Sequence, residues 1–135
     1  MYVNLISSRV RYAETDQMGY VYYGNYPQFF EIGRVEALRA LGISYKKMEE
    51  EGIMLPVLSL EIKYVAPAKY DEVLEIKTEI REMPGTRITF HHEIFNEKGE
   101  LTTIGKVQLV FVRIDTKKPV KAPDYILNAL EEFIP

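Results

Sequence analysis

The feature that most limits how this chain can fold is an alternation of apolar and polar residues that returns in four segments. The segments cover residues 58–64, 74–81, 88–94 and 101–114. Side chains that alternate with period two lie on opposite faces of a strand, so each segment is predicted to be a long strand. The turn sequences MPGT and NEKGE separate the last three segments. Because strands joined by tight turns run antiparallel, a largely antiparallel sheet is expected.

A different period comes before these strands. Over residues 23–41, apolar residues recur near a 3.6-residue spacing, which predicts a long amphipathic helix. Gly33 and Ala37 lie on its apolar face, where their small size would let the helix pack closely on its neighbour. One helix of this length is about the right size to cover one side of a sheet. The predicted fold class is therefore α+β, with a long helix on a largely antiparallel sheet.

Three shorter elements complete the prediction. Residues 4–12 are expected to form a strand, residues 45–51 a short helix, and the segment APDYILNALEEFI a final helix. The chain contains no internal repeat, low-complexity tract or interdomain linker. We therefore expect a single domain over residues 1–135.

Composition excludes several classes of partner. The formal charge is −3, from 17 basic and 20 acidic residues, and general nucleic-acid binding needs a positive field instead. The chain has no cysteine, which removes disulfides, thiolate metal sites and cysteine nucleophiles together. No apolar run reaches the length of a membrane span, and the first residues do not resemble a signal peptide. A cytoplasmic location is the simplest interpretation.

Common catalytic fingerprints are also absent. The sequence has no G-x-S-x-G elbow, no phosphate-binding loop and no dinucleotide-binding glycine motif. His91 and His92 are adjacent in a predicted strand, so their side chains should point to opposite faces and cannot form one metal site alone. We expect an exposed His91 and a core-facing His92 with its hydrogen bonds satisfied. No metal site is predicted.

Asp16 stands out because it lies in the sequence TDQMG, between the first strand and the long helix. Gly19 permits a turn that other residues disfavour, and the tyrosines that follow would line a cleft. The first turn of a helix offers free N–H groups and partial positive charge to an oxygen that becomes negative. Asp16 can attack a carbonyl there or deprotonate a water. Alternatively, Asp16 forms only a turn or cap.

The segments RVRYAETDQMGYVYYGNYPQFFEIGRVEALR and IKYVAPAKYDEVLEIKTEI resemble the 4-hydroxybenzoyl-CoA thioesterase family of hotdog-fold proteins. Within this family, the chain is most similar to the bacterial acyl-CoA thioesterases associated with the Tol–Pal cluster. The resemblance covers nearly the whole chain, and its T-D-x-x-G-x-V-Y motif is specific. It implies a hotdog fold, active sites at a dimer interface, and hydrolysis of an acyl- or aroyl-CoA without a cofactor other than the CoA of the substrate.

The resemblance also implies roles for individual residues. Asp16 matches the catalytic carboxylate, the backbone N–H of Tyr23 matches the group that polarises the thioester carbonyl, and Tyr12 falls where a supporting tyrosine occurs. Four further residues are expected to bind substrate, with Arg87 a candidate for the CoA phosphates: Gly19, Tyr22, Asn25 and Arg87. The Tol–Pal branch has a histidine at the Tyr23 position and the hydroxybenzoyl branch a tyrosine, so the acyl preference stays open.

Two alternatives and one expectation about assembly remain. The chain could act on acyl carrier protein thioesters, with a docking surface among Lys46, Lys47 and Lys69, or it could be a non-catalytic acyl-binding or assembly module. The sequence VQLVFV, residues 107–112, is apolar on both faces and is expected to need cover from a second copy. A homodimer or homotetramer is therefore predicted.

Overall fold

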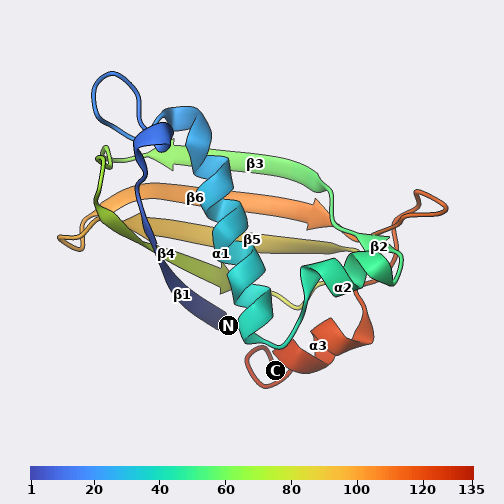
Figure 1. Cartoon of the computed structure of the whole chain (residues 1–135). Coiled ribbons are helices and arrows are strands. Elements are labelled where there is room, and N and C mark those ends of the chain that lie inside the picture. The colour runs from blue at the N-terminus through green and yellow to red at the C-terminus, as the bar shows by residue number, and fades with distance from the viewer.

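The computed structural model describes residues 1–135, and its main element is a five-stranded antiparallel sheet crossed by one long helix (Figure 1). The sheet has the strand order β1-β4-β5-β6-β3, and every pairing within it is antiparallel. The strand bounds are β1 Tyr2–Arg9, β3 Val57–Tyr64, β4 Val73–Ile80, β5 Arg87–Phe95 and β6 Leu101–Val110. The predicted α+β class and antiparallel sheet are confirmed.

Helices occupy one face and one end of this sheet. The long helix α1, Tyr26–Ala40, lies across the face, while α2, Tyr45–Glu50, and α3, Asp124–Leu130, lie together near its far end (Figure 1). Two short strands, β2 Ile53–Met54 and β7 Val112–Arg113, pair beside them. Two 3₁₀ turns, η1 Tyr12–Glu14 and η2 Tyr23–Asn25, frame the loop between β1 and α1.

Three predicted boundaries are wrong, each for a local reason. The first strand ends at Arg9 instead of residue 12, because the carboxylate of Glu14 accepts from the backbone N–H of Arg11 and closes η1. The long helix begins at Tyr26, after η2, with Pro27 within its first turn. The last predicted strand breaks at Phe111, whose backbone bonds Thr86 and Val120 instead of a sheet neighbour.

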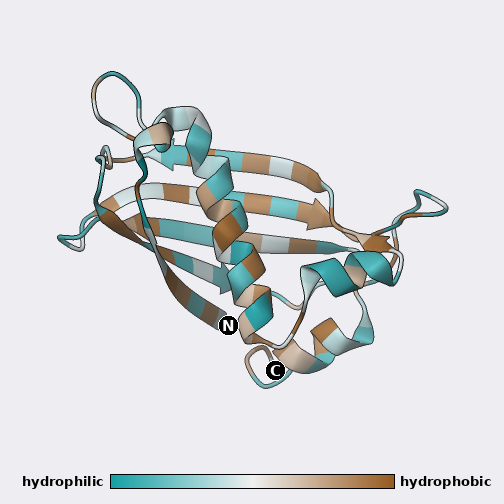
Figure 2. Cartoon of the chain, in the orientation of Figure 1, coloured by the Kyte–Doolittle hydropathy of each residue, from teal (hydrophilic) through white to brown (hydrophobic).

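Very close packing holds α1 on the sheet. Gly33 faces β4, where an added Cβ would lie 2.6 Å from the Thr78 hydroxyl. Gly105 on β6 faces the ring of Phe30, and a Cβ there would overlap that ring. Figure 2 shows apolar residues recurring along α1 and the strands below it. The expected close approach at Gly33 is confirmed, and the glycine on β6 completes it.

The segment 107–112 does not need a second copy to cover it. Val107, Leu109, Phe111 and Val112 are all buried within the single chain. The Phe111 N–H donates to the Thr86 carbonyl at 2.9 Å, and the Val120 N–H donates to the Phe111 carbonyl at 2.8 Å, so the C-terminal segment closes over this strand. The stated reason for an oligomer is therefore wrong. One group of exposed apolar side chains lies elsewhere, on and after β3: Val57, Leu58, Leu60, Tyr64 and Val65.

His92 points into the core, as predicted, but its hydrogen bonding is only half satisfied. Its ring lies parallel to Phe30, with 4.9 Å between centroids, and Nδ1 lies 3.0 Å from the Thr78 hydroxyl. Nε2 is buried without a partner. Burial, together with the positive charges of Arg34 and His91, lowers the pKa of His92 to about 3. His91, on the other face, is half-buried instead of exposed.

None of the helices has both the length and the apolar character that a membrane span needs.

The depressed pKa of His92 predicts acid sensitivity. Below about pH 6.5 the unfolded chain binds a proton that the folded chain refuses until about pH 3, so stability falls as pH falls through that window. By pH 5 the expected loss from this one group is about 2 kcal/mol. Urea unfolding of the wild type and His92→Gln at pH 7, 6 and 5 measures the difference. Parallel pH profiles for wild type and His92→Gln would show that the acid sensitivity does not come from His92.

Candidate active site

The loop between η1 and η2 is shaped by a tight turn at Asp16. The Asp16 N–H donates to the Tyr20 carbonyl at 2.8 Å, and the Gly19 N–H donates to the Asp16 carbonyl at 3.0 Å. Gly19 has φ +78°, in the left-handed region that glycine enters at little cost. The sequence-based explanation for Gly19, a turn that other residues disfavour, agrees with this geometry.

The Asp16 carboxylate has one engaged oxygen and one free oxygen. Oδ1 accepts from the N–H groups of Met18, at 2.9 Å, and Tyr20, at 3.3 Å. Oδ2 receives no hydrogen bond from the chain, and Asp16 takes part in no ion pair. Asp16 is therefore a turn former, as the simpler alternative held, and still presents an uncommitted carboxylate oxygen.

Asp16 is also the residue shared by two cavities. The larger, about 870 Å³, lies on the side of Tyr12 and Tyr70, whose rings meet edge to face at 5.6 Å. The smaller, about 310 Å³, is mostly apolar and reaches Tyr23 and Tyr64. A molecule passing from one cavity to the other would therefore pass the Asp16 carboxylate.

The start of the helix lies on the second of these cavities. Tyr23 is the first residue of η2, so its N–H has no intrahelical acceptor, and neither it nor the Gly24 N–H donates elsewhere in the chain. No acidic side chain occupies the first turn of η2 or of α1. The partial positive charge of this helix end is thus open to an incoming oxygen.

Tyr64, at the end of β3, fixes this helix start, and sequence reasoning treated it only as a strand residue. Its hydroxyl donates to the Tyr23 carbonyl at 2.9 Å, and its ring meets those of Tyr23 and Tyr26 edge to face. The Tyr23 carbonyl and the Gly24 N–H belong to one peptide group. A hydrogen bond to the carbonyl therefore orients that N–H and strengthens it as a donor.

Glu14 joins the helix start to the loop. Its carbonyl accepts from the Tyr22 N–H at 2.9 Å and from the Asn25 side-chain amide at 2.8 Å. Asn25 lines neither of the two cavities that Asp16 shares, and Tyr22 packs its ring against Tyr23 beside Gly24. Tyr22 and Asn25, both predicted to bind substrate, thus contact Tyr23 and Glu14, which surround the helix start.

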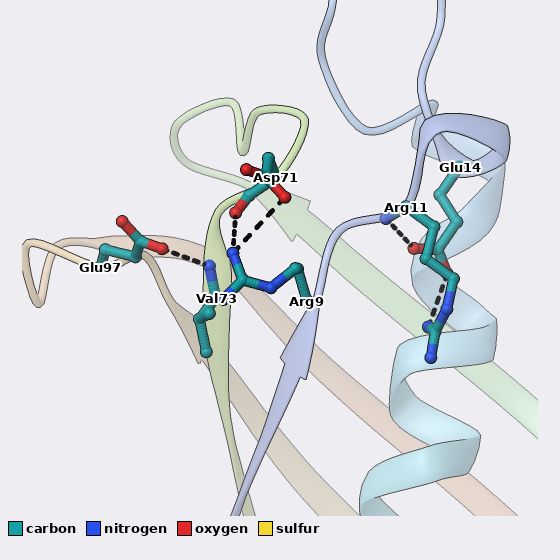
Figure 3. Close-up of polar contacts among 6 residues, drawn as sticks. All are labelled: Arg9, Arg11, Glu14, Asp71, Val73 and Glu97. Atoms are coloured by element: carbon teal, nitrogen blue, oxygen red, sulfur yellow. Dashed lines mark hydrogen bonds and ion pairs between the residues drawn. The ribbon is translucent and has the colours of Figure 1, made fainter.

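Polar contacts hold the surrounding loops in place (Figure 3). Arg9, at the end of β1, donates to the Asp71 carbonyl at 2.7 Å and pairs with its carboxylate, while Glu97 accepts from the Val73 N–H at 2.7 Å. Asp71 follows Tyr70 directly. These bonds fix the loop that carries Tyr70 to the ends of β1 and β4.

The remaining predicted basic residues are not brought to one place. Arg87 begins β5, about 26 Å along that strand from its end nearest the site, at 3.3 Å per residue. Lys69 pairs by its backbone with Tyr20 and lies beside the site. Lys46 and Lys47 are on α2, at the far end of α1, so they form no common surface with Lys69 (Figure 1).

Comparison with known proteins identifies the class to which this fold and loop belong. Residues 10–130 match the family described as the Thioesterase-like superfamily. The chain is 36% identical to the putative acyl-CoA thioesterase YneP of Bacillus subtilis, over 90% of this chain and 88% of that protein. It is also 36% identical to the acyl-CoA thioester hydrolase YbgC of Escherichia coli O157:H7, over 92% of each.

Solved structures point to the same class of protein as these relatives. A DHNA-CoA thioesterase from Staphylococcus aureus superposes with a TM-score of 0.90 and 38% identity, covering 98% of this chain and 89% of that one. A 4-hydroxybenzoyl CoA thioesterase mutant, complexed with 4-hydroxybenzoyl CoA, has a TM-score of 0.83 at 24% identity over 93% and 97%, and shows the shared fold. The chain therefore belongs to the Thioesterase-like superfamily. The predicted hotdog fold, family and class of enzyme, a thioester hydrolase, are confirmed.

The Tyr64 contact yields a prediction about catalysis. Tyr64→Phe keeps the ring but removes the donor to the Tyr23 carbonyl, so kcat for thioester hydrolysis should fall about 2- to 10-fold, the scale of one neutral hydrogen bond. KM and the melting temperature should change little. Tyr125→Phe, on α3 and away from the loop, is the matched control. A fall in stability without a change in kcat would assign Tyr64 a purely structural role.

Proposed function

We propose that this chain, acting as one catalytic domain over residues 1–135, hydrolyses the thioester of an acyl- or aroyl-CoA to a free acid and CoA. The names of its relatives, acyl-CoA thioesterase, acyl-CoA thioester hydrolase and DHNA-CoA thioesterase, support this substrate class. The observation that carries the proposal is Asp16, which lines both cavities and keeps one carboxylate oxygen free of hydrogen bonds within the chain. A CoA arm suits the first cavity and the reacting thioester the second.

The reaction begins with the thioester carbonyl at the start of the helix. Its oxygen accepts from the free N–H of Tyr23, with the adjacent Gly24 N–H as a second donor, and these groups stabilise negative charge on that oxygen. Because the donors are backbone groups held by Tyr64 and Glu14, they need not reorganise as the charge develops. Tyr12 lines the larger cavity and supports the substrate there, together with Gly19.

Asp16 supplies the chemical step by one of two routes. As a nucleophile, its carboxylate forms a bond to the acyl carbon, CoA leaves as a thiolate that takes a proton from solvent, and water then hydrolyses the mixed anhydride. As a general base, it takes a proton from water, whose hydroxide adds to the carbonyl; the carbon–sulfur bond then breaks and the departing thiolate takes that proton from Asp16. Neither route calls on a metal or a further cofactor.

For the phosphate end of CoA, Arg87 is a distant candidate within one chain. Within one chain, Arg87 lies at the opposite end of the sheet from Asp16, whereas Arg11 and Lys69 lie beside the larger cavity's residues in sequence and are exposed. We assign the nucleotide phosphates to these nearer cations. Tyr22 and Asn25 contribute by holding the helix start against Glu14 and Tyr23.

Asp16→Asn is the sharpest test of this mechanism. Asparagine can keep the two hydrogen bonds that Oδ1 accepts, so the turn should survive while the charge is lost. Turnover of the best acyl-CoA should fall about 10²- to 10⁴-fold for a general base, and further for a nucleophile, with KM little changed. Steady-state release of free thiol and melting curves measure the two effects separately.

Asp115→Asn, on the remote turn after β7, is the control for loss of one loop carboxylate. It should leave turnover unchanged. The proposed mechanism is wrong if Asp16→Asn melts normally and keeps more than about a tenth of wild-type kcat, against the general-base scale. Asp16 would then have a turn-forming role alone.

We also propose a homodimer or a tetramer built from such dimers, assembled through β3. This edge strand bonds only β6 and carries a group of exposed apolar side chains, with Val57, Leu58 and Leu60 each more than 40% exposed. An unpaired apolar edge readily adds a strand from another chain. A second copy here would also cover the groove beside Tyr64.

Leu58→Lys tests the β3 interface, because a lysine on a strand edge opposes pairing with a second edge. Sedimentation should show this variant at the 15.7 kDa mass of one chain, and the wild type at twice or four times that mass. Leu5→Lys, on the other edge strand β1, is the matched control and should not dissociate. A folded, fully active wild-type monomer would reject the proposed assembly.

A further inference from the structure

Tyr70 and Asp71, in the loop before β4, connect the turn of Asp16 to the end of β1. On one side, the Tyr70 N–H donates to the Gly19 carbonyl at 3.1 Å, and the Gly19 N–H donates to the Asp16 carbonyl at 3.0 Å. On the other side, the Asp71 N–H donates at 3.0 Å to the carbonyl of Val10, the residue after β1. Two neighbouring N–H groups thus bond two different parts of the chain and hold them together.

The bond to Gly19 reaches further into the turn than any other contact of this loop. Tyr20 pairs with Lys69 as an isolated antiparallel bridge. The bond from Tyr70 to Gly19 extends that pairing by one residue, to the last residue of the turn that Asp16 begins. A shift of Tyr70 would therefore move the turn itself.

The backbone of Asp71 has an uncommon conformation. Its φ is +70°, in the left-handed region, and Lys117, with φ +61°, is the only other residue besides glycine found there. Aspartate is among the residues that tolerate this region, whereas a β-branched side chain is a clear outlier in it. A residue in this conformation turns the chain sharply, which allows the N–H groups of Tyr70 and Asp71 to face different partners.

Arg9, the last residue of β1, holds Asp71 from the strand side. Its guanidinium donates to the Asp71 carbonyl at 2.7 Å and lies 3.4 Å from the Asp71 carboxylate (Figure 3). Both side chains are more than half exposed, so water screens the attraction between the two charges and the ion pair contributes little. The backbone conformation of Asp71 and the bonds to its peptide groups are therefore the features that fix this loop.

We propose that Asp71 is a positioning residue, whose left-handed backbone places the Tyr70 N–H on the Gly19 carbonyl and thereby sets where the Asp16 carboxylate lies. Asp71 lines neither of the two cavities that Asp16 shares, so it acts through its neighbours and not on the substrate. The conformation of its backbone carries this role, and its charge does not. The inference rests on the proposed function, because Asp16 supplies the chemical step there.

Substitutions at Asp71 separate the backbone from the charge. Asp71→Val introduces a β-branched side chain at φ +70°, so the loop must shift. A displacement of about 1 Å at a catalytic group is enough to lower kcat for acyl-CoA hydrolysis about 10- to 100-fold, and KM should change by a smaller factor. Asp71→Gly adopts the same φ without strain and should keep kcat within about threefold of wild type. Asp71→Asn removes the charge, tolerates the same φ and should behave like Asp71→Gly.

Lys117→Val is the matched control. It places the same β-branched side chain at the other left-handed residue, on the turn after β7 and away from Asp16. It should lower the melting temperature as Asp71→Val does, but leave kcat unchanged. If Asp71→Val does not fold, Asp71→Ala takes its place, and its kcat should lie below that of Asp71→Gly because one methyl group is already disfavoured at this φ.

NMR of the backbone amides gives a measurement that does not depend on turnover. In proton–nitrogen correlation spectra, the N–H signals of Met18, Gly19 and Tyr20 should move in Asp71→Val. The same signals should keep their wild-type positions in Asp71→Gly and in Lys117→Val. Movement in the first variant alone would show that the backbone of Asp71 sets the geometry of the turn.

Three outcomes would overturn the inference. These are wild-type kcat in Asp71→Val, unmoved amide signals in that variant, and equal losses of kcat in Asp71→Val and Asp71→Gly, which would assign the role to the side chain and its contact with Arg9. Failure of the proposed function gives a different result. A wild type that releases no thiol from any acyl-CoA would contradict that function, and the amide signals would still decide whether Asp71 positions the turn.

Discussion

The close approach of α1 to the sheet is the contact on which the rest of the structure depends. Gly33 on the helix and Gly105 on β6 each leave out a Cβ, and the ring of Phe30 and the hydroxyl of Thr78 occupy the space. A side chain at either position would displace the helix or its neighbours. Because the helix is rigid, its seating on the sheet also sets where its first residues lie, which is where the reaction is proposed to occur.

The site itself is held mainly by backbone groups. Glu14 presents its carbonyl to Tyr22 and Asn25 from the loop side, and Tyr64 bonds the Tyr23 carbonyl from the sheet side. The helix start is therefore fixed from two directions, while the N–H groups of Tyr23 and Gly24 are left free. Such preorganised donors are effective because they stabilise a developing charge without first having to reorient. Asp16 combines both kinds of role, since one oxygen builds the turn and the other stays available.

One buried polar group does not follow the usual rule that such groups find partners within the fold. His92 keeps Nε2 without an acceptor or donor and stays neutral because of its burial. Packing explains this, because the ring stacks on Phe30 beneath the helix.

The sequence by itself determined the strands, the long helix and the position of Asp16, because period-two and 3.6-residue patterns and turn residues are local signals. It also carried the motif that identified the family. Tertiary structure alone decided which distant groups meet: Tyr64 reaches Tyr23 across 41 residues, and the C-terminal segment covers Phe111, which the sequence left for a second chain to cover. It also separated Arg87 from Asp16 by the length of a strand. Contacts of this kind depend on sheet order and register, which alternation along one strand does not encode.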